Sequence, residues 1–269
     1  MTLELPVIGL GTWPLRGRDG TRAVASALEK GYRLIDSAFN YENEGVVGAA
    51  IRSSAVPREE IIVTTKLPGR HHARAKAVPT IEESVARMGL QYIDLCLIHW
   101  PNPSKDLYVE AWEGLIEARE AGLLKHIGVS NFLPEHIERI EAETGVRPAV
   151  NQLELHPLFP QLDQLPWHAE RNILVEAWSP LRRGNEALDA EPVTSAAATH
   201  GITPAQAILA WHRAIGSIPL PKSADPGRQQ ENLDAMEIEL TEDEVNAISA
   251  LGRPDGRQKD QNPAYYEEM

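Results

Sequence analysis

The sequence predicts an α/β fold, a (β/α)8 TIM barrel, from three observations. Short runs rich in β-branched residues alternate about eight times with longer amphipathic runs, and this alternation favours a parallel sheet. The chain has 269 residues, and eight strand–helix units in roughly 250 residues is the size of such a barrel. No shift in composition and no Pro- or Ser-rich linker divides the chain. A doubly wound open sheet, which also alternates strands and helices, is the alternative.

The expected strands are short apolar runs bounded by turn residues. Their β-branched residues suit a parallel sheet that is buried on both faces. No clear run marks the first strand, for which Val7–Thr12 is the candidate. The others are Leu34–Ala38, Ile61–Lys66, Ile93–His99, His126–Ser130, Val150–Leu155, Ile173–Trp178 and Ser217–Leu220.

The expected helices lie between these strands. Two of them carry clear start signals, Asn131 followed by Pro134 and Thr203 followed by Pro204. We expect one barrel domain over residues 1–269, in which the polar, turn-rich residues 252–269 form an irregular tail that lies over the barrel or stays partly disordered. The predicted helices are Thr21–Lys30, Asn43–Arg52, Thr80–Met88, Leu107–Ala121, Pro134–Glu143, Leu165–Glu170 and Pro204–Ala214.

The composition excludes several classes of partner and site. The formal net charge of -13 argues against a nucleic-acid or anionic-membrane partner. The single cysteine, Cys96, excludes a disulfide within the chain and a two-cysteine metal site, and we interpret it as a small buried hydrophobic residue. No apolar run approaches the roughly 20 residues that span a bilayer, and the N-terminal stretch does not resemble a signal peptide. We therefore expect a soluble, cytoplasmic protein.

Each predicted strand ends on a polar or aromatic side chain. Taken singly, His99 suits a hydrogen-bonded core position, Asp36 a turn cap and Lys66 a solvated strand end. In a barrel, however, the carboxyl ends of all the strands meet at one face, which carries the active site. The convergent set, which we expect to line one pocket, is Thr12 and Trp13, Asp36, Lys66, His99, Ser130 and Asn131, Gln152, Trp178 and Ser179, and Lys222.

Three of these positions, Asp36, Lys66 and His99, together with Tyr41 suit the protonation of an oxygen atom. A short turn after Asp36 would bring the Tyr41 phenol over the barrel mouth, beside Lys66 and His99. A phenol has a pKa of about 10, and a fall of 2–3 units takes about 3–4 kcal/mol. One ammonium about 4 Å away contributes roughly 4 kcal/mol at an effective dielectric near 20, so Lys66 alone suffices. Asp36 would keep Lys66 charged, and His99 would orient a carbonyl or share the proton.

This group of side chains holds no evident nucleophile and no spacing typical of metal ligands. The pair His71 and His72 lies in a basic stretch that we interpret as solvated surface. No metal is therefore expected. A phenol acid with nothing to attack the carbon needs a hydride from a cofactor.

An anion site is indicated where the last strand enters a helix. Lys222, Ser223 and Arg228 follow Pro219–Pro221, and a helix start binds phosphate through its free N–H groups. Such a group would hold a ribose phosphate and favour NADPH over NADH, although an ordinary charged loop is the alternative. Gly9–Gly11 lacks the third glycine of a dinucleotide-binding fingerprint. The Trp178 indole would stack on the nicotinamide ring of the cofactor, or else serve as a core aromatic. Ser130, Asn131 and Gln152 would form hydrogen bonds with the carboxamide of the nicotinamide.

These stretches together resemble the aldo-keto reductase family over nearly the whole chain. The family is a (β/α)8 barrel that reduces aldehydes and ketones with NADPH or sometimes NADH. The matching stretches are GLGTW (Gly9–Trp13), GYRLIDSAFNYENE (Gly31–Glu44), TTK (Thr64–Lys66), LIHWP (Leu97–Pro101), GVSNF (Gly128–Phe132), VNQLELHP (Val150–Pro157) and PLPKSADPGRQQEN (Pro219–Asn232).

The resemblance implies a role for each matching position. The catalytic tetrad falls on Asp36, Tyr41, Lys66 and His99, with Tyr41 as the proton donor and His99 orienting the carbonyl. Cofactor contacts fall on Ser130, Asn131, Gln152, Trp178, Ser179, Leu181, Lys222, Ser223, Arg228, Glu231 and Asn232.

The chain departs from the family pattern beside the cofactor. Trp178 replaces a frequent tyrosine, as in the bacterial diketogluconate reductase branch, which hints at a sugar-acid substrate. Arg182 and Arg183 replace a glycine-rich run, and we expect one of them to reach the cofactor phosphates. The aromatic residues Trp13, Phe39 and Trp100 are expected to line the substrate mouth, whereas Trp112 is expected to be buried between helix and barrel.

The predicted function is therefore reduction of a small carbonyl substrate with NADPH. A regulatory NADPH-binding protein with little turnover is the alternative within the family, and a metal-dependent hydrolase is the alternative outside it. Most family members of this type are monomers, so the resemblance also implies a monomer.

Overall fold

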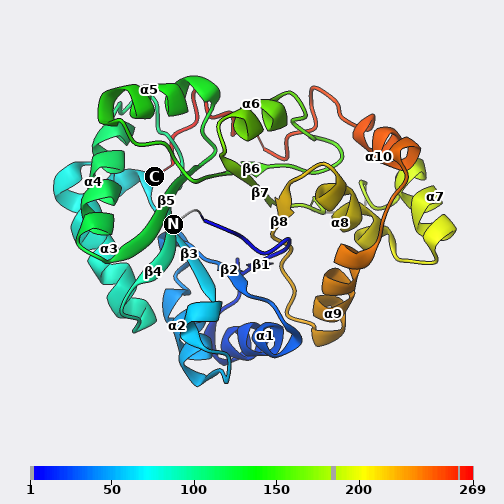
Figure 1. Ribbon diagram of the computed structural model, residues 1–269, viewed down its shortest axis with the longest axis horizontal. Coiled ribbons are helices and arrows are strands. Elements are labelled where there is room, and N and C mark those ends of the chain that lie inside the picture. Colours follow the sequence, from blue (N-terminus) through cyan, green and yellow to red (C-terminus); the bar gives the residue numbers. More distant parts are fainter. Residues whose placement is uncertain (1–2, 183–185, 260, 269) are drawn as a thin grey trace.

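A sheet of eight parallel strands in sequence order forms the centre of the molecule (Figure 1). The computed structural model describes residues 3–182, 186–259 and 261–268. Every adjacent pair from the first strand to the last is parallel, as the alternation of strands and helices predicts. The strands are β1 Leu10–Gly11, β2 Leu34–Asp36, β3 Ile62–Leu67, β4 Ile93–Ile98, β5 Leu124–Ser130, β6 Val150–Glu154, β7 Leu174–Trp178 and β8 Ile218–Pro219.

Hydrogen bonds between the first and last strands close the sheet into a barrel. The N–H of Gly9 donates to the carbonyl oxygen of Pro219 at 3.0 Å, and that of Gly11 to Pro221 at 3.1 Å. A Cβ at Gly11 would lie only 2.6 Å from the carbonyl oxygen of Leu220, so this seam requires glycine. The predicted (β/α)8 barrel is confirmed, and the open sheet is excluded.

The helices form the outer wall of the barrel (Figure 1). Side-chain caps begin several of them: Thr203 accepts from the N–H of Gln206, and Asp225 from the N–H of Arg228. The α-helices are α1 Gly17–Lys30, α2 Glu44–Ser53, α3 Arg74–Met88, α4 Tyr108–Glu120, α5 Pro134–Thr144, α6 Gln164–Glu170, α7 Glu191–His200, α8 Pro204–Ala214, α9 Pro226–Asp234 and α10 Glu242–Ser249. Short 3₁₀ turns are η1 Phe39–Tyr41, η2 Arg58–Glu60, η3 Gly69–His71 and η4 Ala235–Glu237.

The structure corrects the predicted elements in three places. Helices α7 and α10 have no counterpart among the predicted helices, and of α9 only the start after the last strand was expected. Helix α3 begins at Arg74 rather than Thr80 and contains Pro79 in its second turn. The first and last strands, β1 and β8, are two residues each, shorter than predicted.

The space between the sheet and the helices is filled by apolar side chains. Trp112 is fully buried there, as predicted, and its indole N–H donates to the carbonyl oxygen of Val146 at 3.0 Å. Cys96 is buried in β4, and burial raises the pKa of its thiol, consistent with an unreactive core residue. Within the described residues, no helix is long and apolar enough to cross a bilayer.

Among the described residues of the tail that follows α10, none forms regular secondary structure, and Glu268 is fixed to the loop after β4. The Asn102 amide donates to the carbonyl oxygen of Glu268 at 2.7 Å, and the Glu268 N–H donates to Asn102 Oδ1 at 3.0 Å. The Tyr266 ring packs on Trp100, with 4.5 Å between the ring centroids. The tail therefore forms one wall of the barrel mouth.

Candidate active site

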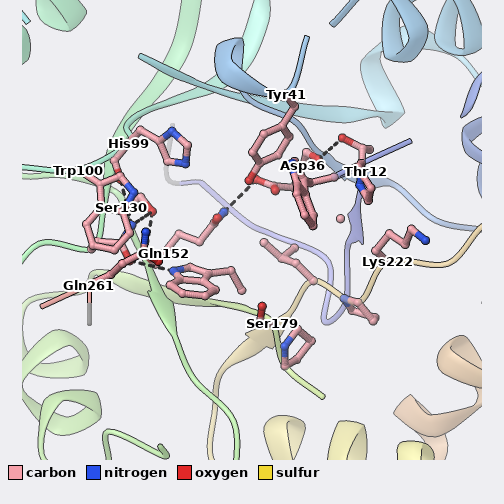
Figure 2. A pocket seen from close by; sticks show the side chains of 18 of the residues that line it. Thr12, Asp36, Tyr41, His99, Trp100, Ser130, Gln152, Ser179, Lys222 and Gln261 are labelled. Atoms are coloured by element: carbon pink, nitrogen blue, oxygen red, sulfur yellow. Dashed lines mark hydrogen bonds between the residues drawn. The ribbon is translucent and has the colours of Figure 1, made fainter. Parts of the chain in front are cut away.

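A cavity of about 580 Å3 opens at the carboxyl ends of the strands (Figure 2). Its volume lies in the range of small-molecule sites, about 300–1,000 Å3. Strand ends and the tail both contribute to its wall. The predicted site residues that line it are Thr12, Trp13, Asp36, Tyr41, His99, Trp100, Ser130, Asn131, Gln152, Trp178, Ser179, Leu181, Arg182 and Lys222.

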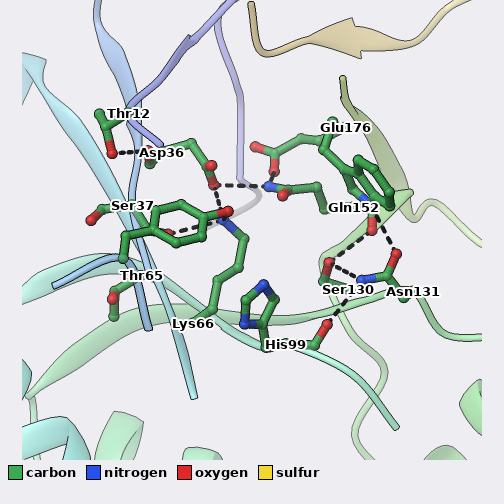
Figure 3. A network of polar contacts seen from close by, with 12 residues as sticks. Thr12, Asp36, Ser37, Thr65, Lys66, His99, Ser130, Asn131, Gln152 and Glu176 are labelled. Carbon is green, nitrogen blue, oxygen red and sulfur yellow. Dashed lines mark hydrogen bonds and ion pairs between the residues drawn. The ribbon is translucent and has the colours of Figure 1, made fainter. Parts of the chain in front are cut away.

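Lys66 lies beneath this cavity and joins two of its lining residues (Figure 3). Its ammonium is 2.6 Å from Asp36 Oδ1, 2.9 Å from the carbonyl oxygen of Ser37 and 3.4 Å from the Tyr41 hydroxyl. The parallel register sets Asp36 opposite Thr64, so Lys66, two residues further along β3, projects from the same face. The Lys66 side chain is only 1% exposed. Burial alone would lower the pKa of Lys66, but the charge of Asp36 raises it, so the side chain stays charged.

Tyr41 reaches the cavity from η1, the turn that directly follows β2. The ring stands edge-on to His99, with 6.0 Å between the centroids. Asn43 holds the turn in place, because it accepts from the Ser37 hydroxyl at 2.7 Å and donates to the carbonyl oxygen of Thr12 at 3.0 Å. The sequence-based prediction that the turn returns Tyr41 to the barrel mouth agrees with this geometry.

The acidity of Tyr41 differs from the sequence-based expectation. The sequence suggested that Lys66 alone would lower the pKa of the phenol. In the structure, burial raises the pKa of Tyr41 by more than the Lys66 charge lowers it, and the charge of Asp36 raises it further. The phenol therefore holds its proton at neutral pH, which is the form that a proton donor needs.

Gln152 links Asp36 to a buried carboxylate that the sequence analysis missed. The amide of Gln152 donates to Asp36 Oδ1 at 2.9 Å and to Glu176 Oε2 at 2.7 Å (Figure 3). Glu176 is opposite Gln152 in the register of β6 and β7 and is fully buried. Burial, followed by the charge of Asp36, raises the pKa of Glu176 to about 7.

Replacing Glu176 with glutamine is expected to stabilise the protein above pH 7. Because folding raises the pKa of Glu176 from 4.5 to about 7, the folded state binds more protons in this window, and stability falls as the pH rises through it. At 1.36 kcal/mol per unit, Glu176→Gln should add up to about 3 kcal/mol at pH 8 and much less at pH 5. Urea unfolding at both pH values measures this. An equal gain at pH 5 and pH 8, or the same gain in the exposed control Glu59→Gln, would contradict the prediction.

A polar network fixes the indole of Trp178 at the end of β7. The indole N–H donates to Asn131 Oδ1 at 2.8 Å, and the Asn131 amide donates to the carbonyl oxygen of His99 and to Ser130 Oγ, both at 3.0 Å. Asn131 has a positive φ of 61°, a conformation that asparagine tolerates better than most residues. Trp178 is half-buried and lines the cavity. It can therefore present its ring face to a planar ligand.

The basic residues expected to bind phosphate are exposed where β8 leads into α9. Lys222 lines the cavity, and Arg228 lies in the first turn of α9. Ser223 holds the turn between them: its hydroxyl donates to the carbonyl oxygen of Asp225 and accepts from the Asp225 N–H, both at 3.1 Å. A cavity lined by a fixed indole and by Lys222, with Arg228 exposed in the first turn of α9, suits a phosphorylated dinucleotide.

Several predicted residues lie elsewhere. Phe39 does not line this cavity. The Arg87 guanidinium packs on the Phe39 ring instead, with its carbon 4.2 Å from the ring centroid. Asn232 is buried in α9 and does not line this cavity. Glu231 is exposed on α9, and its carbonyl oxygen accepts from Gln206.

Of the two arginines after β7 that were expected to reach the cofactor phosphates, the structure describes only Arg182. Arg182 lines the cavity but forms an ion pair with Glu186. Arg183 lies outside the described residues.

In the described part of the chain, no group of three or more His, Cys, Asp or Glu side chains lies close enough together to hold a metal ion.

Comparison with known proteins identifies the family. The model of the aldo/keto reductase family matches residues 7–253. This chain belongs to the aldo/keto reductase family. It is 52% identical over 261 residues to 2,5-diketo-D-gluconic acid reductase B of a Corynebacterium species, covering 97% of this chain and 94% of that protein. It is 43% identical over 248 residues to the methylglyoxal reductase DkgA of Escherichia coli, covering 92% and 90%.

A solved structure agrees with this assignment. A variant of Gox0644 in complex with NADPH superposes with a TM-score of 0.91 at 40% identity, covering 97% of this chain and 94% of that one. The resemblance seen in the sequence is thus confirmed, including the likeness to the diketogluconate reductase branch. The protein is an oxidoreductase of the aldo/keto reductase family.

Proposed function

We propose that this protein reduces aldehyde or ketone groups of small molecules to alcohols with NADPH, and that Tyr41 donates the proton. One observation supports the proton donor above all others. The Tyr41 hydroxyl, in the wall of the cavity, is 3.4 Å from a buried ammonium, Lys66, which is itself paired with Asp36 at 2.6 Å. The cofactor is supported by the NADPH complex of the Gox0644 variant and by the cavity that joins Trp178 to Lys222.

In the proposed reaction, NADPH supplies the hydride that adds to the carbonyl carbon. The carbonyl oxygen gains negative charge, and the Tyr41 hydroxyl donates its proton to it. The Lys66 ammonium stabilises the phenolate that Tyr41 becomes, since opposite charges at this distance in a dry site attract strongly. Asp36 keeps that ammonium charged and aimed, and His99 orients the carbonyl oxygen. Trp13 and Trp100 would contact the rest of the substrate.

The names of the relatives suggest which carbonyl compounds to try. One relative is named for 2,5-diketo-D-gluconic acid and another for methylglyoxal, and both compounds carry two carbonyl groups. The decisive experiment follows NADPH oxidation with aldehydes, α-diketones and keto sugar acids. We expect turnover with at least one class, unaffected by a chelator. NADPH binding without turnover would favour the regulatory alternative, and chelator sensitivity the hydrolase alternative.

Removing either exposed cation near α9 is expected to weaken NADPH binding but not NADH binding. A hydrogen bond to a charged group contributes about 1.5–3 kcal/mol, so Lys222→Ala and Arg228→Ala should each raise the dissociation constant for NADPH by about 10- to 100-fold. Titration of the intrinsic fluorescence with each cofactor measures this. Lys105→Ala, an exposed lysine in the loop after β4, is the control. An equal effect on NADH would show that these residues do not bind the extra phosphate.

Arg182 is proposed to bind the cofactor phosphates by exchanging its Glu186 partner for them. Unchanged NADPH affinity in Arg182→Ala would contradict this.

We also propose that the chain acts as one domain over residues 1–269, as a monomer without nucleic-acid partners and in the cytoplasm. Sedimentation of the purified protein tests the monomer.

A further inference from the structure

The end of the tail places a carboxylate on the active-site histidine. Glu268 Oε1 is 2.7 Å from His99 Nδ1, and the two side chains are only 9% and 13% exposed. Both residues line the cavity. Figure 2 shows the imidazole beside the Tyr41 ring. With Nδ1 against the carboxylate, Nε2 is the nitrogen left for a substrate.

The protein holds this carboxylate with several other contacts. Glu268 Oε1 also accepts from the Asn40 amide at 2.7 Å, and Oε2 accepts from the N–H of Gly69 at 2.9 Å. The backbone of Glu268 is paired with Asn102. Burial would raise the pKa of Glu268, but the charge of His99 and these hydrogen bonds hold it below its usual value. Glu268 is therefore ionised at neutral pH.

The other ionisable groups around His99 do not place a negative charge against the imidazole. The Lys66 ammonium is already paired with Asp36. His72, which the sequence-based interpretation placed on the solvated surface, is instead buried after η3. Burial lowers the pKa of its ring to about 4, so it is neutral near pH 7. Tyr41 keeps its proton because burial raises the pKa of the phenol. Among the described residues around the ring, Glu268 is the anion in direct contact with it.

We infer that Glu268 is a positioning residue for His99: it holds the imidazole by Nδ1 and compensates its positive charge, so that Nε2 can donate a hydrogen bond to the carbonyl oxygen. For Nε2 to donate while Nδ1 faces a carboxylate, both ring nitrogens must carry a proton. A neighbouring anion favours that charged form. This inference rests on the proposed reduction, because it gives the donated hydrogen bond a substrate oxygen.

The test compares two adjacent glutamates of the tail. Glu268→Gln keeps the size of the side chain but removes the charge that faces His99. Glu267→Gln is the matched control, because the Glu267 carboxylate accepts from the N–H of Ser104 at 2.7 Å and so also fixes the tail to the loop after β4. We expect Glu268→Gln to lower kcat/KM for the carbonyl substrate by about 10- to 100-fold, with unchanged NADPH affinity. Glu267→Gln should match the wild type.

A nitrogen-15 NMR measurement of the imidazole provides a second readout that does not depend on activity. The ring signals of His99 are those missing from His99→Gln. At neutral pH we expect both His99 nitrogens to be protonated in the wild type and only one in Glu268→Gln. Equal losses of activity in the two glutamate variants, or an unchanged His99 spectrum in Glu268→Gln, would overturn the inference.

The two readouts separate this inference from the proposed function. If the wild type reduces no carbonyl compound with NADPH, the proposed function fails, and the NMR comparison alone decides whether Glu268 holds the charged form of His99. If the wild type is active and Glu268→Gln equals it in rate and spectrum, the positioning role alone is wrong.

Discussion

Replacing Tyr41 with phenylalanine is expected to lower kcat for carbonyl reduction by about 100- to 10,000-fold, the range that a positioned general acid contributes. The variant loses one hydroxyl, the group that lies 3.4 Å from the Lys66 ammonium. The ring still fills its place beside His99, so the cavity keeps its shape. NADPH should bind with unchanged affinity, because the proposed cofactor contacts lie on Trp178 and Lys222. Single-turnover measurements at saturating NADPH would separate binding from chemistry.

A second tyrosine provides the control for this variant. Tyr108 is also buried, and its hydroxyl accepts from the Arg139 guanidinium at 3.3 Å, away from the cavity. Tyr108→Phe should keep its kcat while losing the stability of one hydrogen bond, about 1 kcal/mol. If Tyr41→Phe retains wild-type turnover, the phenol is not the proton donor, and His99 becomes the candidate acid.

The fold was predictable because its strands and helices alternate along the sequence in local patterns. Strand β4, for example, was predicted to end at His99 and ends at Ile98. The two missed helices lack a strong apolar stripe. Helix α7 buries mainly small side chains, Val193, Ala196 and Ala197, and α10 buries Ile248 alone. Packing against their neighbours stabilises both helices, and a single sequence does not show that packing.

Most of the site was predictable because its residues occupy strand ends. Once the sheet is parallel and closed, Asp36, Lys66 and Gln152 must project into the same end of the barrel. For residues in a short turn or helix, the direction in which the side chain faces depends on how that element is rotated about its axis. In η1, Phe39 packs outward while Tyr41 faces the cavity. In α9, Asn232 is buried, whereas Arg228 is exposed.

The two missed carboxylates differ in how they could have been found. Glu176 gave a signal, since it is a charged residue within the apolar run Ile173–Trp178. Glu268 gave none. It belongs to an irregular tail, and its contact with His99 joins positions far apart in the sequence that no periodic pattern relates. Only the folded chain shows that Glu268 of the tail lines the cavity at the strand ends.

Removing the Lys66 ammonium is expected to damage both stability and turnover. In Lys66→Met, Asp36 and Glu176 would face each other across Gln152 without a nearby cation. Breaking a buried ion pair costs about 3–5 kcal/mol, because a charge is left in the dry interior without compensation. The phenolate form of Tyr41 would lose an interaction of roughly 4 kcal/mol, so kcat should fall by about 1,000-fold. Urea unfolding and NADPH oxidation measure the two effects separately.

The double variant Asp36→Asn with Lys66→Met distinguishes structural from catalytic loss. The amide that this variant carries in place of the Asp36 carboxylate would be neutral and could still accept from the Gln152 amide, so no uncompensated charge would remain at this position. Most of the lost stability should return, which would appear as a strong coupling free energy between the two substitutions. Turnover should stay low, because no ammonium would lie beside Tyr41. Recovery of both stability and turnover would mean that Lys66 serves only to compensate Asp36, and that another group stabilises the phenolate.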